Sequence, residues 1–225
     1  MTALDFLVAS YALTCSIYLV FFILLVIRGL IRTISQRAFA AWILFLALTS
    51  MTGTIWHASS NPDTVFILCR VDFTVLMISA LMILLFSILF HRDTRGSDFL
   101  SLIPAIIVIP LIWTVMVSSV EQTNLGLNAV VTGWFVLYAL VHFGYYIAAS
   151  VQLAVVLQVV RKTRDPEAVR RVGILLVSVI ALTVLGILTT LSFTFFSVEW
   201  LPSVINLCLC IPPFLMASTF FLSRD

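Results

Sequence analysis

The sequence predicts an all-α polytopic membrane protein, a bundle of seven transmembrane helices that forms one domain over residues 1–225. The first observation is composition: 62% of the 225 residues are hydrophobic and 10% are charged, with a mean hydropathy of +1.20. A soluble domain has about 45–50% apolar and about 25% charged residues. The second observation is spacing, because a helix crosses the bilayer with about 20 mainly apolar residues. Seven stretches meet this requirement, at residues 4–27, 38–56, 65–90, 99–119, 133–160, 172–196 and 203–222.

The stretch 4–27 is predicted to be a retained helix and not a cleaved signal peptide. It is longer than the apolar part of a signal peptide, no Lys or Arg precedes it, and three arginines follow it. The connections between the later stretches are short, which predicts that consecutive helices are antiparallel neighbours. The chain reaches only Asp225 after the last stretch, so no kinase or other output domain is expected within it.

Basic residues occupy alternate connections, and this pattern predicts how the helices are oriented. They follow the first, third, fifth and seventh stretches, at Arg28, Arg32, Arg37, Arg92, Arg95, Arg161, Lys162, Arg164, Arg170, Arg171 and Arg224. The other connections carry Asp63, Glu121 and Glu199 without Lys or Arg. Lys and Arg near helix ends stay in the cytoplasm. The N-terminus is therefore expected outside and the C-terminus inside the plasma membrane, with a prokaryotic inner membrane favoured.

Polar side chains concentrate in the outer halves of the predicted helices, which predicts a cavity that opens outward. Hydroxyl groups recur over 10–16 and 49–54, whereas 19–27 and 38–48 hold no hydroxyl, amide or ionisable side chain. Polar groups in hydrocarbon are unfavourable unless they face protein or water. The alternative is that Ser and Thr bond their own backbone or a neighbouring helix, which needs no ligand.

Five residues of the outer halves are candidate ligand-binding residues: Arg70, Asp72, Tyr138, His142 and Asn206. Arg70 is expected roughly 8 Å inside its helix and Asp72 about 3 Å deeper, about 200° apart, so the two cannot share one face. Arg70 either reaches outer lipid headgroups or pairs with an outer acidic residue or an anionic ligand. Asp72 is too short to reach the surface and is expected to face the bundle, paired or protonated.

An aromatic stripe is predicted on the helix 133–160. Trp134, Tyr138, His142 and Tyr145 follow one another at helical spacing, and His142 is expected roughly 13 Å deep. Such a stripe either packs against neighbouring helices or lines a ligand site. A lone His in a helix bundle is usually hydrogen-bonded between helices, so both alternatives stay open for His142.

Two of the predicted helices contain prolines that remove backbone donors. Pro104 and Pro110 lie in 99–119, and Pro212 and Pro213 lie in 203–222. Each pair is expected to kink or unwind its helix. A bend in 203–222 either permits motion toward the cytoplasmic end or is purely structural.

No enzyme, cofactor or metal site is predicted. The four cysteines, Cys15, Cys69, Cys208 and Cys210, lie in apolar stretches without metal-ligand spacing and are expected to be buried small hydrophobes. A retinal photoreceptor needs a lysine within a helix, but the only lysine is Lys162 in a connection. The three histidines are scattered and do not form a metal-hydrolase ligand set. The formal net charge of +2 is too small to indicate nucleic acid as a partner.

Three short segments give the sequence a resemblance to a known family. They are Ala40-Ala41-Trp42 after a basic connection, Gly133-Trp134-Phe135 followed by Tyr138 and Tyr145-Tyr146, and Arg170-Arg171 leading into Gly173-Ile174-Leu175-Leu176. In these segments, and over nearly its full length, the chain resembles the seven-transmembrane N-terminal sensor region of prokaryotic histidine kinases. The resemblance implies a sensor of signals at or within the membrane that acts on a cytoplasmic output. It implies no particular ligand residue.

The expected function is a non-enzymatic sensory module that binds a small apolar or amphipathic ligand in an outward-facing cavity. The signal would pass to a separate signalling output protein, whose candidate contacts are Arg161, Lys162, Arg164, Arg170 and Arg171. One alternative is a small transporter or channel, which needs a polar path that continues inward. Another is a scaffold that only assembles other membrane proteins. The lipid bilayer is an expected partner, and a homo-oligomer stays open.

Overall fold

The protein is an all-α bundle of long apolar helices. The structure is a computed structural model that describes residues 2–90, 100–123, 125–163, 165–195 and 201–221, with the side chains of 191–195 and 220–221 excepted. Within these residues, six helical spans are long and apolar enough to cross a membrane. They are α1 (Ala3–Ile27), α2 (Ile34–Ala58), α3 (Pro62–Leu89), α5 (Phe135–Lys162), α6 (Pro166–Phe195), and α7 (Leu201–Cys208) followed by α8 (Ile211–Phe221). These correspond to the predicted first, second, third, fifth, sixth and seventh helices.

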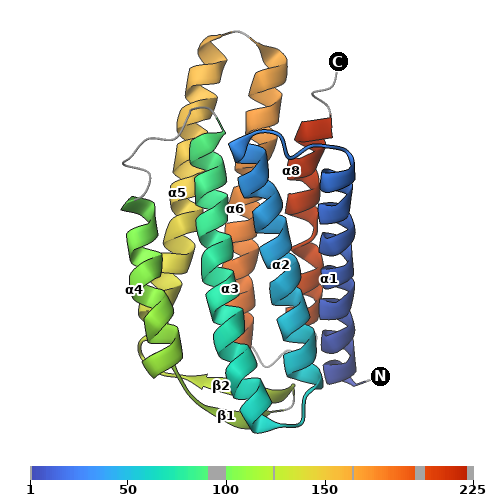
Figure 1. The fold of residues 1–225 in the computed structure, drawn as a ribbon, viewed down its shortest axis with the longest axis vertical. Helices are drawn as coiled ribbons and strands as arrows, with labels where there is room; N and C mark the ends of the chain where they lie inside the picture. The colour runs from blue at the N-terminus through green and yellow to red at the C-terminus, as the bar shows by residue number, and fades with distance from the viewer. Residues whose placement is uncertain (1, 91–99, 124, 164, 196–200, 222–225) are drawn as a thin grey trace.

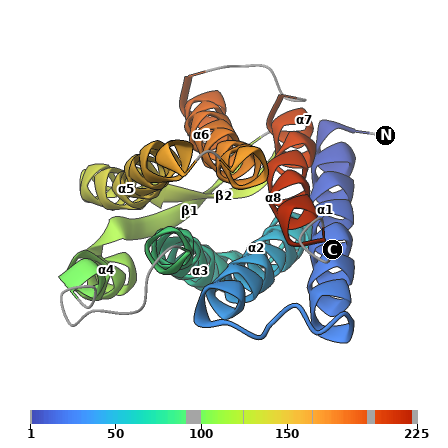
Figure 2. The same cartoon turned by 90° about the horizontal axis from the view of Figure 1, so that it is seen from above.

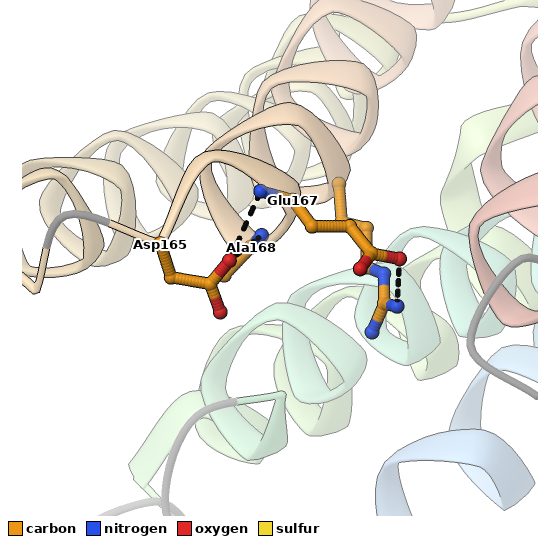
Figure 3. A network of polar contacts seen from close by, with 4 residues as sticks. Asp165, Glu167 and Ala168 are labelled. Atoms are coloured by element: carbon orange, nitrogen blue, oxygen red, sulfur yellow. Dashed lines mark hydrogen bonds and ion pairs between the residues drawn. The ribbon is translucent and has the colours of Figure 1, made fainter. Parts of the chain in front are cut away.

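Polar caps extend three of the helices beyond their apolar stretches. Thr33 and Gln36 begin α2 with a capping box, in which Thr33 Oγ1 accepts from the Gln36 amide at 3.2 Å and Gln36 Oε1 accepts from the Thr33 amide at 3.0 Å. Asn61 accepts backbone N–H groups in the first turn of α3. Asp165 does the same for α6 (Figure 3). These caps satisfy N–H groups that have no partner within the helix.

The fourth predicted helix is shorter than a transmembrane helix, so the count of seven spanning helices is not confirmed. A turn at 100–102 leads into α4 (Ile103–Leu111), which a π-helix, η2 (Ile112–Met116), continues. The apolar helix Leu100–Met116 is about 26 Å long at 1.5 Å per residue, less than the hydrocarbon core of about 30 Å. Pro110, inside α4, has no N–H group to donate. The wider π-helix begins two residues later.

A β-hairpin that the sequence analysis did not predict follows the short helix. The strands β1 (Val117–Thr123) and β2 (Gly126–Val131) pair antiparallel, so residues 117–119 are extended and not helical. Trp56 Nε1 donates to the Leu127 carbonyl at 2.6 Å, which ties the hairpin to the end of α2. The hairpin lies across the end of the bundle at which the chain begins (Figure 1), and we call this end the hairpin end.

The six long spans form a closed ring. Going around it, α1 packs on α2, α2 on α3, α3 on α5, α5 on α6, α6 on α7 and α8, and α7 on α1. Figure 2 shows this ring from above, with α4 outside it against α3 and α5. Consecutive helices are therefore neighbours, and α4 lies outside the ring because α3 contacts α5 directly.

Charge separates the two ends of the bundle. The connections α1–α2 and α5–α6 lie opposite the hairpin end (Figure 1), and we call that end the basic end. Within the described part of the chain, every Lys and Arg except Arg70 is at the basic end: Arg28, Arg32, Arg37, Arg161, Lys162, Arg170 and Arg171. Asp63 and Glu121 are at the hairpin end. Arg92, Arg95, Arg164, Glu199 and Arg224 lie outside the described residues.

Candidate ligand-binding cavity

A cavity of about 190 Å³ lies inside the ring. Every long span contributes to it, through residues in the middle of the helix or in its half nearest the hairpin end. The lining residues are Tyr11, Tyr18, Leu46, Thr49, Ser50, Asp72, Phe73, Leu76, Phe135, Tyr138, Ala139, His142, Phe143, Tyr146, Leu182, Gly186, Thr189, Thr190, Asn206 and Leu209. Four of the five candidate ligand-binding residues, Asp72, Tyr138, His142 and Asn206, are thus brought together by the fold.

Asp72 on α3 is the one Asp or Glu among the lining residues. Its side chain is buried, and Thr52 Oγ1 donates to its Oδ1 at 2.6 Å. The Thr52 hydroxyl can donate only one hydrogen, and the Thr49 carbonyl oxygen, 2.8 Å from Thr52 Oγ1, competes with Asp72 for it. Within the described residues, Asp72 forms no ion pair and accepts no further hydrogen bond from a side chain. The described residues therefore stabilise this carboxyl group only weakly.

Arg70 is separated from the other four candidates. Its Nη2 donates to the Val117 carbonyl of β1 at 3.3 Å, and its Cζ lies 4.0 Å from the centre of the Phe66 ring. The side chain is half-buried and is not part of the cavity lining. Arg70 and Asp72 lie about 200° apart around α3, so the cavity that takes Asp72 cannot also take Arg70. Arg70 holds the hairpin instead.

The aromatic stripe of α5 that faces the cavity shares Tyr138 and His142 with the predicted stripe and differs in its other two members. Phe135, Tyr138, His142 and Tyr146 line the cavity. The rings of Tyr138 and His142 are stacked at 5.6 Å, and those of His142 and Tyr146 are 5.4 Å apart. Both this set and the predicted set fit helical spacing, so sequence spacing alone could not choose between them.

Trp134 and Tyr145, the other members of the predicted stripe, point elsewhere. Trp134 is 51% exposed. Tyr145 Oη donates to the Ser101 carbonyl at 2.7 Å and accepts from the Ala105 amide at 3.0 Å. It thereby satisfies a backbone N–H group in the first turn of α4 and attaches that peripheral helix to the ring.

Three residues that line the cavity carry a buried polar atom without a partner. Thr49 Oγ1, Tyr138 Oη and His142 Nδ1 form no hydrogen bond with the described residues. Buried polar groups in proteins are usually hydrogen-bonded, and an unpaired one costs about 1–3 kcal/mol. All three atoms belong to residues that line the cavity, but the atoms themselves are enclosed by protein, so a bound molecule would reach them only after these side chains turn.

One wall of the cavity is formed by the broken helix α7–α8. Asn206 is buried near the end of α7 and its Nδ2 lies 3.3 Å from Ser10 Oγ of α1. Tyr18 Oη donates to the Leu209 carbonyl at 2.9 Å. In a continuous helix this carbonyl would accept from residue 213, but Pro213 has no N–H group. The predicted unwinding at Pro212 and Pro213 is confirmed, and Tyr18 satisfies a carbonyl that it leaves free.

The half of the bundle toward the basic end is packed mainly with apolar side chains. Phe39, Trp42, Ile83, Phe86 and Leu153 are all at most 1% exposed. The rings of Phe39 and Phe86 are 5.4 Å apart. The buried Ser79, Ser87, Ser178 and Thr219 are exceptions. The cavity is thus closed on this side by a dense core.

The candidate partner contacts lie at the basic end, away from the cavity. Arg161, Lys162 and Arg170 are exposed, and Arg171 is half-exposed and forms an ion pair with Glu167 one turn earlier (Figure 3). Arg164 is outside the described residues. An exposed i, i+4 ion pair contributes about 0.3–0.5 kcal/mol, so this surface is defined by its positive charge more than by internal bonding.

The described part of the chain contains all four cysteines. All four cysteines are free; Cys69 is buried, whereas Cys15, Cys208 and Cys210 are partly exposed, so the expectation of burial was wrong for these three. No group of three or more His, Cys, Asp or Glu side chains among the described residues is placed to hold a metal ion.

The comparisons with known proteins add no family. A scan against protein-family models finds no match, and a search of curated proteins finds none either. The resemblance to the sensor region of histidine kinases therefore stays a prediction, and what the chain does has to be argued from its cavity and its charged end.

Proposed function

We propose that the protein is a multi-pass membrane sensor that binds a small molecule in the cavity and relays its occupancy to the basic end. One observation carries the proposal: polar and aromatic side chains of all six long spans converge on one cavity, while the opposite half of the ring is closed by apolar packing. Polar groups within a membrane are unfavourable unless they face protein, water or a ligand, and they commonly mark a functional site.

The proposed orientation places the hairpin end outside and the basic end in the cytoplasm of a prokaryotic inner membrane. The positive residues at one end support it, because Lys and Arg near helix ends are retained in the cytoplasm. Single cysteines at Gln122 in β1 and at Thr163 after α5 test it, in a chain whose four native cysteines are replaced by alanine. A membrane-impermeant maleimide should label Q122C in intact cells and T163C only after permeabilisation. The reverse pattern would invert the assignment.

The relay can be tested without knowing the ligand. Ala139 lines the cavity, whereas Ala148 lies on the exposed side of the same helix. Ala139→Phe therefore fills the cavity in place of a ligand, and Ala148→Phe is its matched control. Spin labels at Arg32 and Thr163 should report a changed distance distribution at the basic end for A139F and none for A148F. Identical distributions in both variants would contradict the relay.

The proposed output is a separate cytoplasmic protein that contacts the exposed basic residues of the α5–α6 turn. Their charge supports this, because clustered positive side chains favour an acidic partner surface. The resemblance to the input region of histidine kinases points to a signalling protein as that partner. A homo-oligomer and contact with anionic lipid headgroups remain compatible with the same surface.

A transporter is the second candidate, and the broken helix α7–α8 favours it. Many transporters form their substrate sites from discontinuous helices near the middle of the membrane. Transport requires that the packed half open at some stage, whereas a sensor keeps it closed. Leu153→Cys on α5, in the same cysteine-free chain, discriminates: reaction with an impermeant thiol reagent from the basic side would favour transport. Protection there, with T163C reactive, would favour a sensor.

A further inference from the structure

The cavity combines a carboxyl group with an absence of positive charge. Asp72 receives one hydrogen bond, from Thr52, and forms no ion pair among the described residues. The nearest arginine in the sequence, Arg70, is directed to the hairpin. An isolated buried carboxylate is strongly unfavourable unless a partner compensates its charge or the group takes up a proton. A ligand with one positive charge would provide that compensation, whereas an anionic ligand would add repulsion.

The rest of the wall suits a cation because seven of its other nineteen residues are Phe or Tyr. Phe73 lies next to Asp72 in sequence, and its ring is 5.2 Å from that of Tyr138 and 6.0 Å from that of Phe135. Tyr11 and Tyr146 also line the space. The face of an aromatic ring attracts ammonium groups, and such contacts strengthen when water is excluded. Aromatic cages bind quaternary ammonium ligands in this way.

The volume limits the size of the ligand. A cavity of about 150 Å³ accommodates benzene, so the cavity of about 190 Å³ suits a molecule of roughly eight non-hydrogen atoms. Long lipids and peptides do not fit this space.

From these three observations we propose that the cavity binds a small organic cation, with its ammonium group against Asp72 and the rings of Phe73 and Tyr138. This inference rests on the proposed function in one respect, namely that the cavity is a ligand site. It adds the chemical class of the ligand, which is narrower than the expected small apolar or amphipathic signal.

Two pairs of probes of matched shape test the inference. Choline is compared with 3,3-dimethylbutan-1-ol, and phenethylamine with 2-phenylethanol, so that each pair differs mainly in charge. Binding is measured calorimetrically with the full chain in maltoside micelles and sodium phosphate, because choline lipids and amine buffers would compete. At least one cation is expected to bind tenfold or more tightly than its neutral partner. A139F should abolish that binding, and A148F should not.

Substitution of the carboxyl group separates charge from shape. Asp72→Asn should weaken the cation at least tenfold and leave the neutral partner unchanged, while Asp63→Asn, at an exposed carboxylate at the start of the same helix, should change neither. If D72N does not fold, Phe73→Leu should reduce the preference for the cation. Equal binding of charged and neutral probes would overturn the cation while leaving a ligand cavity in place. No binding of any probe to the folded wild-type chain would also overturn the inference, and the spin-label result then decides the proposed function independently.

Discussion

The close contact of Gly53 with Tyr11 makes the cavity wall sensitive to a single methyl group. A Cβ atom added at Gly53 would lie 2.7 Å from both Cδ1 and Cε1 of Tyr11. Favourable carbon–carbon contacts are about 3.5–4.0 Å long, so the ring would have to move by about 1 Å. The ring lines the cavity and stacks on His57 at 5.5 Å. His57 in turn stacks on Trp56 at 5.1 Å, the residue that holds the hairpin, so the displacement would affect both features.

Two opposing terms set the size of the effect of Gly53→Ala. Overpacking of a well-packed site destabilises by about 1–3 kcal/mol. Replacing glycine by alanine within a helix stabilises by about 0.5–1 kcal/mol. The net loss of unfolding free energy is therefore expected near 1 kcal/mol, or about 2–4 °C in Tm for a chain of this length. Gly144→Ala on α5 meets no atom within 4 Å and is the control, expected to gain stability.

Thermal unfolding of both variants in the same detergent measures the difference, and the double variant identifies its cause. G53A should unfold below the wild type and G144A above it. Adding Tyr11→Leu removes the ring that meets the new methyl group, so G53A should then cost little or nothing in that background. A G53A variant as stable as G144A, or a loss that persists without the Tyr11 ring, would refute the packing of Tyr11 on Gly53.

Hydroxyl and indole groups that make specific backbone contacts provide further predictions. Tyr145→Phe should lower the unfolding free energy by about 1–3 kcal/mol, because two backbone groups near the start of α4 lose a partner. Tyr138→Phe, which removes an unpaired hydroxyl group, should lower Tm less than Y145F in the same thermal assay; the opposite order would contradict this assignment. Trp56→Phe removes the donor to the Leu127 carbonyl and should accelerate hydrogen exchange over 117–131. Unchanged exchange there would show that other contacts hold the hairpin.

Hydropathy predicted the existence of the long helices but not where they begin. The interval 172–196 omits the first turn and a half of α6, because Asp165 and Glu167 are charged and Pro166 disrupts helix interiors. All three nevertheless begin a helix well. The same holds for α2, whose first turn depends on the capping box of Thr33 and Gln36. Cap chemistry is visible in a sequence, and a prediction that included it would have extended these helices in the right direction.

The fourth stretch shows where hydropathy misleads. Residues 99–119 are as apolar as the other stretches, but their helix ends at Met116 and a hairpin follows. Pro110 in the sequence indicated that this helix would be irregular. The change from helix to strand, however, depends on the pairing of β1 with β2 and on contacts from α2 and α3. Pairing between segments and contacts with distant helices are long-range terms that a window along one stretch does not contain.

The sequence predicted which half of the bundle holds the candidate site, but not which face of α5 lines it. The gradient of polar residues pointed to one half of the bundle, and four of the five candidate residues line one cavity toward the hairpin end. Tyr146 was missed and Tyr145 chosen in its place, because 100° per residue makes either tyrosine a continuation of the stripe. Only the position of α4 outside the ring decides between them: Tyr145 faces the start of α4, which leaves Tyr146 to the cavity.

The position of α4 also explains why Arg70 and Asp72 differ in role. Because α3 packs directly on α5, the face of α3 that carries Asp72 is enclosed by the ring. The face that carries Arg70 is left to the hairpin that follows α4. A bundle with seven equivalent helices could have placed both side chains at buried interfaces and paired them with other groups. The six-membered ring instead separates a weakly compensated carboxyl group from the arginine two residues before it, and that separation is what makes a cationic ligand the natural complement of the cavity.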